Sequence, residues 1–245
     1  MLYTLPAPII FAHRGASHDA PENTIAAFEL ARQQGADAIE LDVKLSADEV
    51  PVVIHDPTVE RTTNGNGAVA NLSLLALKKL DAGEGQKIPT LSEVFDAVGG
   101  DILINIELTN YYGTRDDNLV EKVVEVVKKH NLANKIIFSS FLPKNLKRAA
   151  KLLPQSPRGL LALPNLLGWV VRNYLFRVGD FQALHPKLNN CTKRQIENAH
   201  SISRRVHVWT VDDAEDMRRF ADWGVDGIIT PNPQLAVKVL REGGE

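Results

Sequence analysis

The chain has 245 residues, a length that suits one large domain and leaves no room for a second one. Its formal net charge of −2, with no basic run, excludes the electrostatic footprint of a nucleic-acid-binding protein. Its one cysteine, Cys191, excludes an intramolecular disulfide framework and a zinc cluster held by thiolates.

The first apolar run of the chain, residues 9–11, predicts a buried parallel strand. This run is soon followed by His13, Arg14 and Gly15. Charged side chains at the end of a buried strand are typical of a functional site, so His13 and Arg14 are candidate site residues. The first six residues lack the basic segment and the long apolar segment of a signal peptide, which predicts a cytoplasmic protein.

A helix is predicted over residues 25–34, because apolar side chains recur there at helical spacing and Gly35 follows. Asn23 is a candidate N-cap for this helix. Glu22 and Asn23 therefore have two interpretations. They only begin the helix, or they belong to the shell around a bound metal.

Two carboxylates share one side of the next predicted strand, residues 38–43. Glu40 and Asp42 stand two positions apart, so both point to the same face, opposite the apolar side chains. Two carboxylates on one face require a cation nearby.

A hairpin is predicted after this strand, because residues 46–49 form a polar turn too short for a helix and residues 50–54 form a second strand. A turn centred between the last two residues of that polar stretch places Asp42 opposite His55 in antiparallel pairing. A carboxylate and a histidine then share one patch of surface. The next residue, Asp56, either orients His55 or caps a turn.

Residues 57–100 form a stretch too long for a simple loop and are predicted to be a small insertion. A short helix is expected near residues 72–80, and Thr90 with Glu93 has the form of a capping box that opens another helix. Arg61 is interpreted as a salt-bridging residue that fixes the insertion. The insertion either covers part of the site or only packs on the rim of the domain.

The remaining sequence alternates strand-like runs with helical stretches, which is typical of a parallel sheet covered by helices. The predicted strands are residues 9–11, 38–43, 102–107, 135–141, 158–163, 181–185, 206–211 and 227–230. They number eight if residues 50–54 are the antiparallel return of the hairpin. In the alternative count, residues 50–54 join the sheet and one of the late runs does not.

The most apolar stretch of the chain is residues 160–178. It fails as a membrane span because Pro164, Asn165 and Arg172 interrupt it and because it is short. The favoured interpretation is a buried helix that begins at Leu166. The alternatives are a rim helix that offers an apolar contact to acyl chains or to a membrane surface, and a helix that pairs two subunits.

Six groups of residues occur together in a fixed order along the chain. They are His13-Arg14-Gly15, Pro21-Glu22-Asn23-Thr24, Glu40-Leu41-Asp42-Val43, His55-Asp56-Pro57 with Arg61-Thr62-Thr63, Asn105-Ile106-Glu107-Leu108, and Trp209-Thr210-Val211. In this order and spacing the chain resembles the glycerophosphodiester phosphodiesterase family over nearly its whole length. The resemblance implies a (β/α)8 TIM barrel formed by one domain over residues 1–245, with a small insertion at about residues 57–100 after the His55 strand.

The resemblance also implies roles for the site residues. One divalent cation is held by Glu40, Asp42 and Glu107, and ligation by oxygen atoms alone favours Mg2+ or Ca2+ over zinc. The two catalytic histidines are His13 and His55. One of them activates the nucleophile and the other protonates the departing alcohol.

Three further positions are candidates for binding the substrate. Arg14 holds a phosphate oxygen. Trp209, at a late strand end, either forms a wall against the glycerol or head group or packs in the core. The family has a lysine where this chain has Thr109, and Lys44 or Lys187 is the candidate replacement for that charge.

The expected function is metal-dependent hydrolysis of glycerophosphodiesters to sn-glycerol 3-phosphate and an alcohol. The nucleophile is water or the adjacent glycerol hydroxyl, and the second route passes through a cyclic phosphate. A lysophospholipase D or cyclising phosphodiester lyase that acts on lysolipids is one rival, favoured by Thr109 and the apolar stretch. A non-catalytic barrel that binds phosphodiesters is another. No nucleic-acid partner and no transmembrane segment are expected, and the oligomeric state stays open.

Overall fold

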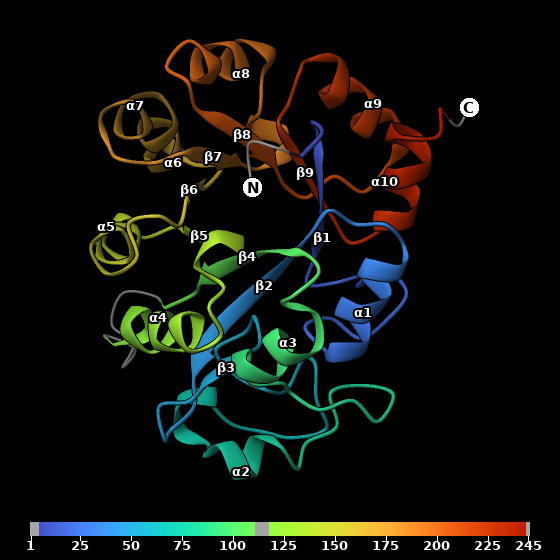
Figure 1. Cartoon of the computed structure of the whole chain (residues 1–245), viewed down its shortest axis with the longest axis vertical. Helices are drawn as coiled ribbons and strands as arrows, with labels where there is room; N and C mark the ends of the chain where they lie inside the picture. Colours follow the sequence, from blue (N-terminus) through green and yellow to red (C-terminus); the bar gives the residue numbers. More distant parts are fainter. Residues whose placement is uncertain (1–4, 111–117, 244–245) are drawn as a thin grey trace.

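The computed structural model describes residues 5–110 and 118–243, and over these residues eight parallel strands close into a barrel with helices outside it (Figure 1). The strands are β1 (Ile9–His13), β2 (Ala38–Leu45), β4 (Leu103–Leu108), β5 (Ile136–Ser140), β6 (Arg158–Ala162), β7 (Ala183–Pro186), β8 (Arg205–Val208) and β9 (Gly227–Thr230). β1 pairs with both β9 and β2, which closes the ring. The predicted (β/α)8 TIM barrel is confirmed, and residues 50–54 belong to the hairpin. Most of residues 1–6, on which the cytoplasmic prediction rests, lie outside the described residues.

Helices cover the barrel because the outward side of each strand is apolar. They are α1 (Ile25–Gln33), α3 (Leu91–Val98), α4 (Leu119–Lys129), α5 (Pro143–Leu152), α6 (Leu166–Val170), α7 (Phe176–Val178), α8 (Lys193–His200), α9 (Ala214–Asp222) and α10 (Pro233–Leu240). A π-helical segment, Val171–Leu175, joins α6 to α7. The outward side chains of β2, Ile39, Leu41 and Val43, are fully buried in the main core between strands and helices.

The inside of the barrel changes from apolar to polar along its axis. Near the amino ends of the strands it is filled by Ile9, Phe11, Ala38, Leu103, Ile137 and Ile229. Toward the carboxyl ends, inward positions of the same strands carry His13, Glu40, Asn105, Glu107 and Ser139. TIM barrels build their sites at the carboxyl ends of the strands, so this polar layer marks the functional end.

The hairpin that follows β2 forms, but the prediction that Asp42 lies opposite His55 is wrong by one residue. β3 (Pro51–Val53) pairs antiparallel with β2. Continued by one pair, this register sets Asp42 opposite Ile54, whose N–H donates to the Asp42 carbonyl over 3.0 Å. His55 lies just beyond the paired residues.

The turn explains the shift in register. A backbone hydrogen bond joins Ser46 to Val50, so the turn is centred on Asp48. Glu49 adopts the left-handed conformation with a φ of +59°. A three-residue loop that ends in a left-handed residue is a common hairpin connection, and its odd length moves the pairing by one residue relative to a loop of even length.

The segment between β3 and α3 leaves the barrel and carries a small core of its own. The buried members of this core are Val52, Ile54, Val59, Val69, Leu77, Ala82 and Ile88. The segment contains the short helix α2 (Leu74–Leu77), and in Figure 1 it extends away from the barrel below β3. The chain returns at α3, where the predicted capping box of Thr90 and Glu93 is confirmed. That the whole chain forms one domain stays a prediction.

The start of α1 corrects the prediction for Asn23. Thr24 caps the helix instead, and its hydroxyl accepts a hydrogen bond from the Ala27 N–H over 3.2 Å. Asn23 precedes the cap in the left-handed conformation, with a φ of +57°. Its side chain is buried and contacts Asp42 in the barrel.

The apolar stretch at residues 160–178 is helical from Leu166, but the favoured interpretation of a buried helix is wrong. Leu166, Leu167 and Val178 are 79%, 66% and 84% exposed. Phe176, by contrast, is buried in the main core. The stretch is apolar on more than one face, whereas a helix on the outside of a barrel buries only the face toward the strands.

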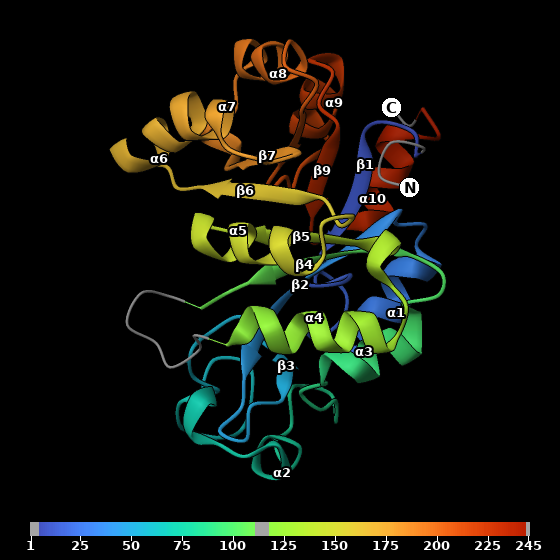
Figure 2. The same ribbon diagram turned by 60° about the vertical axis from the view of Figure 1, so that its left-hand side comes forward.

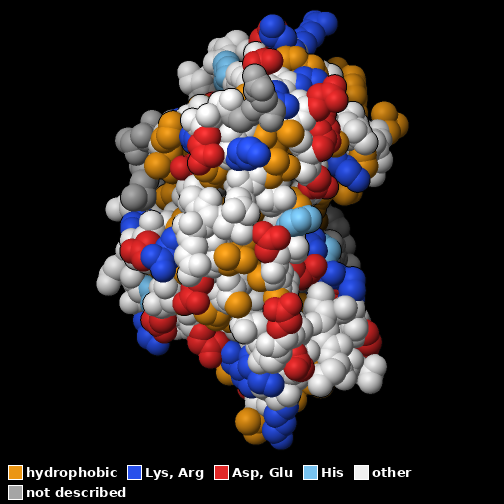
Figure 3. Space-filling model, turned by 90° about the vertical axis from the view of Figure 1, so that its right-hand side faces the viewer, with side chains coloured by type: hydrophobic (Ala, Val, Ile, Leu, Met, Phe, Trp, Pro, Cys, Tyr) orange, Lys and Arg blue, Asp and Glu red, His pale blue; other side chains and the backbone are white. Residues whose placement is uncertain are grey.

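No helix among the described residues is long and apolar enough to cross a bilayer. Figure 3 shows acidic and basic side chains interspersed over the side of the molecule on which α1 and α10 lie in Figure 1. That side carries no broad region of a single charge.

Candidate active site

A cavity of about 230 Å3 lies at the carboxyl ends of the barrel strands. It is lined by His13, Arg14, Glu40, His55, Asn105, Glu107, Ser139, Phe141, Leu161, His185, Trp209, Thr210 and Ile229. Six of the eight residues predicted for the site are among these. Of the other two, Asp42 is buried in contact with Arg14, and Lys187 is exposed and does not line the cavity.

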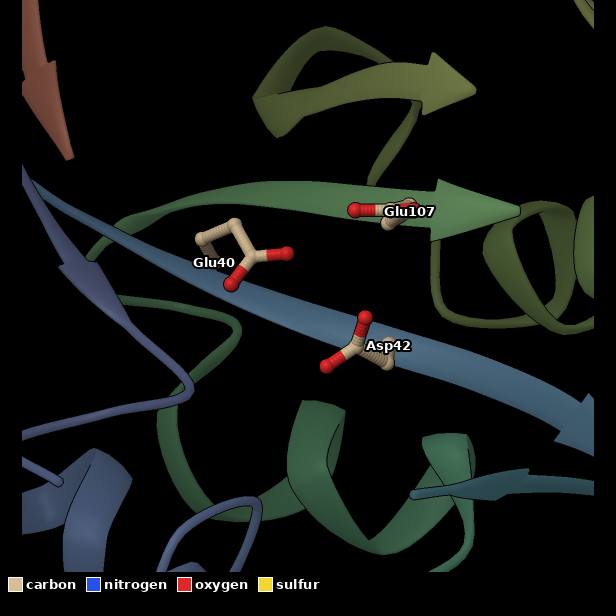
Figure 4. A group of neighbouring side chains, drawn as sticks. All are labelled: Glu40, Asp42 and Glu107. Carbon is tan, nitrogen blue, oxygen red and sulfur yellow. The ribbon is translucent and has the colours of Figure 1, made fainter. Parts of the chain in front are cut away.

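The buried Glu40 and Asp42 and the half-buried Glu107 form a cluster on two neighbouring strands (Figure 4). β2 and β4 pair in parallel with Asp42 beside Glu107, and Glu40 stands two residues earlier on the same side of β2. Each residue offers a carboxylate oxygen, and these three oxygens lie within 4.8 Å of one another. Such a donor set fits a divalent cation that prefers oxygen ligands.

The charges of this cluster disfavour one another. Burial raises the pKa of Glu107 to about 8, and the Asp42 carboxylate adds to the effect. Burial, followed by the charges of Asp42 and Glu107, raises the pKa of Glu40 well above its ordinary value. Buried carboxylates that lie together favour the protonated form unless positive charge is supplied. A divalent cation supplies it, so the electrostatics fit such an ion as well as the donor atoms do.

Arg14 lies over the cluster. Its Nε is 3.3 Å from Asp42 Oδ2, and its Nη1 donates to Glu22 Oε1 over 2.9 Å. Its backbone N–H donates to Glu40 Oε2 over 3.1 Å. The left-handed backbone of Arg14, with a φ of +58°, turns both its N–H and its side chain to the carboxylates. Although burial lowers the pKa of Arg14, the Asp42 and Glu22 carboxylates raise it overall.

Asn23 contacts the cluster directly. Its Nδ2 donates to Asp42 Oδ2 over 3.0 Å. Glu22 and Asn23 had two interpretations, a helix start or a place in the shell around a metal. For Asn23 the contacts favour the shell, because it touches a predicted metal ligand and Thr24 caps the helix.

His13 ends β1 directly beside Glu40 of β2, with Nε2 3.9 Å from Glu40 Oε2. That separation is too long for a hydrogen bond. Burial and the adjacent Arg14 charge lower the pKa of His13 to about 4. His13 is therefore a neutral imidazole at neutral pH and is able to accept a proton.

His55 is held by a chain of charged side chains. Its Nδ1 lies 2.6 Å from Asp56 Oδ1, and Asp56 accepts a hydrogen bond from Arg61 Nε over 2.6 Å. Arg61 also donates twice to Glu22, over 2.8 Å each time. The Arg61 hydrogen bond lowers the pKa of Asp56 to about 2. Although burial raises the pKa of Glu22, hydrogen bonds from Arg61 and Arg14 lower it to about 2.

These contacts bear on two predictions. The Asp56 carboxylate meets the His55 imidazole directly, which favours orientation of His55 over the capping of a turn. Arg61 is confirmed as a salt-bridging residue, and it ties the inserted segment to the loop after β1 through Glu22.

Lys44 brings a positive charge to Thr109. Its Nζ donates to the Thr109 carbonyl over 2.9 Å and to the Thr109 hydroxyl over 3.1 Å. The Lys44 side chain is buried, and its charge opposes the increase in the pKa of Glu107. Lys44 therefore brings a positive charge to position 109, although neither Lys44 nor Lys187 lines the cavity.

Trp209 forms one side of the cavity. Its Nε1 donates to the His185 carbonyl over 2.8 Å, which fixes the indole ring. The ring meets Phe141 edge to face, with 5.9 Å between the ring centroids. Both rings line the cavity, so the structure favours the wall over core packing for Trp209. Sequence reasoning missed Phe141, for which the only signal was its place just after β5.

Three buried side chains on another part of the cavity, here called the polar wall, are Asn105, Ser139 and His185. Asn105 Oδ1, Ser139 Oγ and His185 Nδ1 have no hydrogen-bond partner within the described residues. His185 Nε2 lies 3.0 Å from Nδ1 of the buried His207, and burial lowers the pKa of His185 to about 3. Buried polar atoms rarely stay unpaired, so the polar wall marks a place where a polar ligand or water binds.

The polar wall was only partly predictable. Asn105 and His185 stand out in the sequence because each lies on or at the end of a predicted strand. Ser139 carries no signal except the alternation of inward and outward side chains along β5.

Known proteins resemble this chain over most of its length. A family model described as the glycerophosphoryl diester phosphodiesterase family matches residues 13–235. A glycerophosphodiester phosphodiesterase of Caldanaerobacter subterraneus subsp. tengcongensis is 41% identical, and the match covers 96% of this chain and 99% of the relative.

Solved structures agree with the sequence matches. A phosphodiesterase of Oleispira antarctica, solved in complex with the product sn-glycerol-3-phosphate, is 31% identical with a TM-score of 0.86, and the match covers 98% of each chain. A glycerophosphodiester phosphodiesterase of Thermotoga maritima is 30% identical with a TM-score of 0.78, and the match covers 96% of this chain and 99% of the other.

Proposed function

Because the chain belongs to the glycerophosphoryl diester phosphodiesterase family, it is a phosphodiester hydrolase, and we propose that its cavity cleaves glycerophosphodiesters to sn-glycerol 3-phosphate and an alcohol. The product complex of the Oleispira antarctica relative supports this product. The observation that carries the proposal is a single cavity in which two histidines, an arginine and two of the three clustered carboxylates meet.

Glu40, Asp42 and Glu107 hold one divalent cation, Mg2+ or Ca2+. Their oxygen donors, the burial of Glu40 and Asp42, and the raised pKa values of Glu40 and Glu107 all fit such an ion. When bound, the cation would place positive charge beside the phosphate. This charge would stabilise the negative charge that develops in the transition state. Arg14 supplies a second positive charge to the phosphate.

His13 is the general base. It is neutral at neutral pH, because burial and Arg14 lower its pKa to about 4. It therefore takes the proton from the attacking hydroxyl group.

His55 is the general acid. Asp56 accepts the Nδ1–H of the imidazole, which leaves Nε2 as the atom that gives a proton to the departing alkoxide.

The polar wall binds the hydroxyl groups of the glycerol. Asn105 Oδ1, Ser139 Oγ and His185 Nδ1 have no partner within the described residues, and a polyol offers both donors and acceptors. A glycerol held this way keeps its own hydroxyl close to the phosphate, so the nucleophile is either that hydroxyl or a water. Trp209 and Phe141 present an apolar wall to the carbon chain.

A second candidate is cleavage of lysolipids by a lysophospholipase D or a cyclising lyase. It is favoured by the exposed leucines of residues 163–167, which follow β6 at the carboxyl end of the barrel. A barrel that only binds phosphodiesters is less favoured, because both histidines and all three carboxylates are present.

The test is a phosphorus NMR time course with glycerophosphoethanolamine and a lysophospholipid together, in Mg2+ or Ca2+ and again with EDTA. The proposal expects sn-glycerol 3-phosphate to appear first and only with metal. A cyclic phosphate or lysophosphatidate signal in its place selects the lysolipid or lyase candidate. Binding of the diester without turnover in any divalent metal would overturn catalysis altogether.

A cytoplasmic location and the absence of a nucleic-acid partner stay predictions from the sequence. The near-neutral net charge supports the prediction about nucleic acid.

A further inference from the structure

An exposed apolar surface lies on the helix that follows β6. Seven of the eight large hydrophobic side chains that are exposed in the described residues lie within residues 163–178. The helical part, residues 166–178, is here called the rim helix and consists of α6, the π-helical segment and α7. Contiguous exposed apolar side chains of this kind mark a surface that binds something.

The rim helix is held in place by its own contacts. Arg172 Nη1 donates to the Leu163 carbonyl over 2.6 Å, and Gly168 N–H donates to Asn165 Oδ1 over 2.9 Å. A Cβ on Gly168 would stand 1.7 Å from the Leu163 carbonyl oxygen, so only glycine permits this close return of the loop. The apolar side chains are therefore presented by a fixed element.

A cationic groove runs beside the apolar side chains. It has a volume of about 810 Å3 and lies between the rim helix and the start of α8. Arg172, Arg177 and Arg194 line it, and no aspartate or glutamate does. Trp169 and Tyr174 belong to both surfaces, because they line the groove and are exposed, with ring centroids 5.6 Å apart.

The rim helix begins at the end of the barrel where the cavity opens. Only three residues separate the end of β6 at Ala162 from Leu166, and Leu161 of β6 lines the cavity. Figure 2 shows α6 starting beyond the end of β6, at the outer edge of the molecule.

We propose that the rim helix and its cationic groove dock the protein on the surface of an anionic phospholipid bilayer. Leucine and tryptophan side chains enter the boundary between head groups and acyl chains, as on other interfacial helices. Arg177 and Arg194, both exposed, meet the lipid phosphates, and a groove without carboxylates suits that charge.

A second copy of this chain suits the surface less well. A two-fold interface would set the same patch against itself and bring the arginines of both copies together. Like charges placed opposite one another across an interface oppose association. The bilayer is therefore the occupant that the charge favours.

The test is co-sedimentation of the purified protein with mixed phosphatidylglycerol–phosphatidylcholine vesicles and with pure phosphatidylcholine vesicles. We expect binding to the anionic vesicles that weakens as salt is added. Leu166→Ser with Leu167→Ser should lower this binding about tenfold. Leu75→Ser is the matched control, because Leu75 is 71% exposed on α2, and it should bind like the parent protein.

A second pair of variants tests the charges. Arg177→Gln with Arg194→Gln should weaken binding about fivefold for each cation removed. Lys128→Gln with Lys129→Gln, on exposed positions of α4, removes the same net charge elsewhere and should leave binding unchanged. All the altered side chains are exposed, and a circular dichroism melt checks that each variant is folded.

Three results would overturn the proposal. They are no binding to anionic vesicles, equal loss in the control variants, and a dimer in solution that Leu166→Ser with Leu167→Ser converts to a monomer. The proposal is separate from catalysis, so the His13→Ala variant should bind vesicles like the parent protein.

Discussion

Arg14 and Arg61 show how the site balances its charges at the scale of single residues. Arg14 lies between Glu22 and Asp42, and Arg61 lies between Glu22 and Asp56. Their carboxylate partners Glu22 and Asp56 have lowered pKa values and stay ionised. Glu40 and Glu107 have raised pKa values in spite of the nearby Arg14 charge, so Arg14 alone does not balance the negative charge of the cluster.

Glu40→Ala and His13→Ala separate the metal from the proton transfer. Glu40→Ala should abolish both metal binding and activity, since it removes one of three ligands. His13→Ala should lower the turnover rate by about a hundredfold or more and leave metal affinity nearly unchanged. Isothermal titration with the metal and a glycerol 3-phosphate release assay measure the two effects. Retained activity in either variant contradicts the role given to that residue.

Asp56→Asn tests whether Asp56 orients His55. The amide keeps the shape of the side chain but loses the charge that favours the Nδ1–H tautomer, so kcat should fall by about a hundredfold with little change in KM. Asp101→Asn, at an exposed position on another part of the surface, is the control. A rate equal to that of the parent protein would show that Asp56 only caps a turn.

At the scale of elements, alternation along each strand and the ends of the elements decide which side chains reach the cavity. Glu40, Asp42 and Lys44 all point inward because they occupy alternate positions of β2. Because the register of the hairpin differs by one residue from the predicted register, His55 does not lie opposite Asp42. Its imidazole contacts Asp56 instead. Because Thr24 is the N-cap of α1, the Asn23 side chain is not used as a cap and contacts Asp42 instead.

The contribution of the α3 capping box to the free energy of unfolding can be measured. Thr90 accepts from the Glu93 N–H over 3.1 Å, and Glu93 accepts from the Thr90 N–H over 2.7 Å. Thr90→Ala should lower the free energy of unfolding by about 1 kcal/mol, because it removes the hydroxyl oxygen that accepts the Glu93 N–H. Urea denaturation measures the change. Thr90→Ser retains the hydroxyl and should recover most of the stability, and equal losses in both variants would place the effect in packing.

At the scale of the whole molecule, closure of the barrel assembles the site. His13 of β1 and Glu40 of β2 are direct neighbours in the sheet, and Trp209 arrives from the far end of the chain. The apolar layer at the amino ends of the strands supports this polar layer from within the barrel. Removing the carboxylate cluster from water is the cost of building the site inside the fold.

That cost makes stability depend on pH and on the metal. The pKa of Glu107 is raised to about 8 in the folded protein, above its ordinary value of 4.5. A raised carboxyl pKa stabilises the fold fully below the unfolded value, and this contribution is lost as the pH rises through about 8. Metal binding requires the ionised carboxylates and releases their protons, so it should strengthen over the same range.

The expected result is that Mg2+ or Ca2+ raises Tm more at mildly alkaline pH than at mildly acid pH. Differential scanning fluorimetry with and without EDTA measures this difference. Glu107→Gln, which cannot ionise, should flatten the dependence. A metal effect on Tm that is independent of pH would contradict the raised pKa of the cluster.

The sequence by itself determined a parallel sheet covered by helices, and its resemblance to the family implied the closed barrel and most of the site. Apolar runs predicted the strands, with two counts left open, and alternation put Glu40 with Asp42 on one face. These features are local, because a residue's own neighbours decide its strand, its face and its cap. The capping box of Thr90 and Glu93 was predictable from the sequence for the same reason.

Only the tertiary structure decided how the elements meet. The register of the hairpin depends on the backbone of Glu49, and the partner of Asn23 depends on where α1 starts. Lys44 contacts Thr109, which is 65 residues later in the chain but follows the strand that pairs with β2. The apolar composition of residues 160–178 predicted a buried helix. Exposure, however, depends on which faces of a helix its neighbours cover, and the barrel covers only one face of this helix.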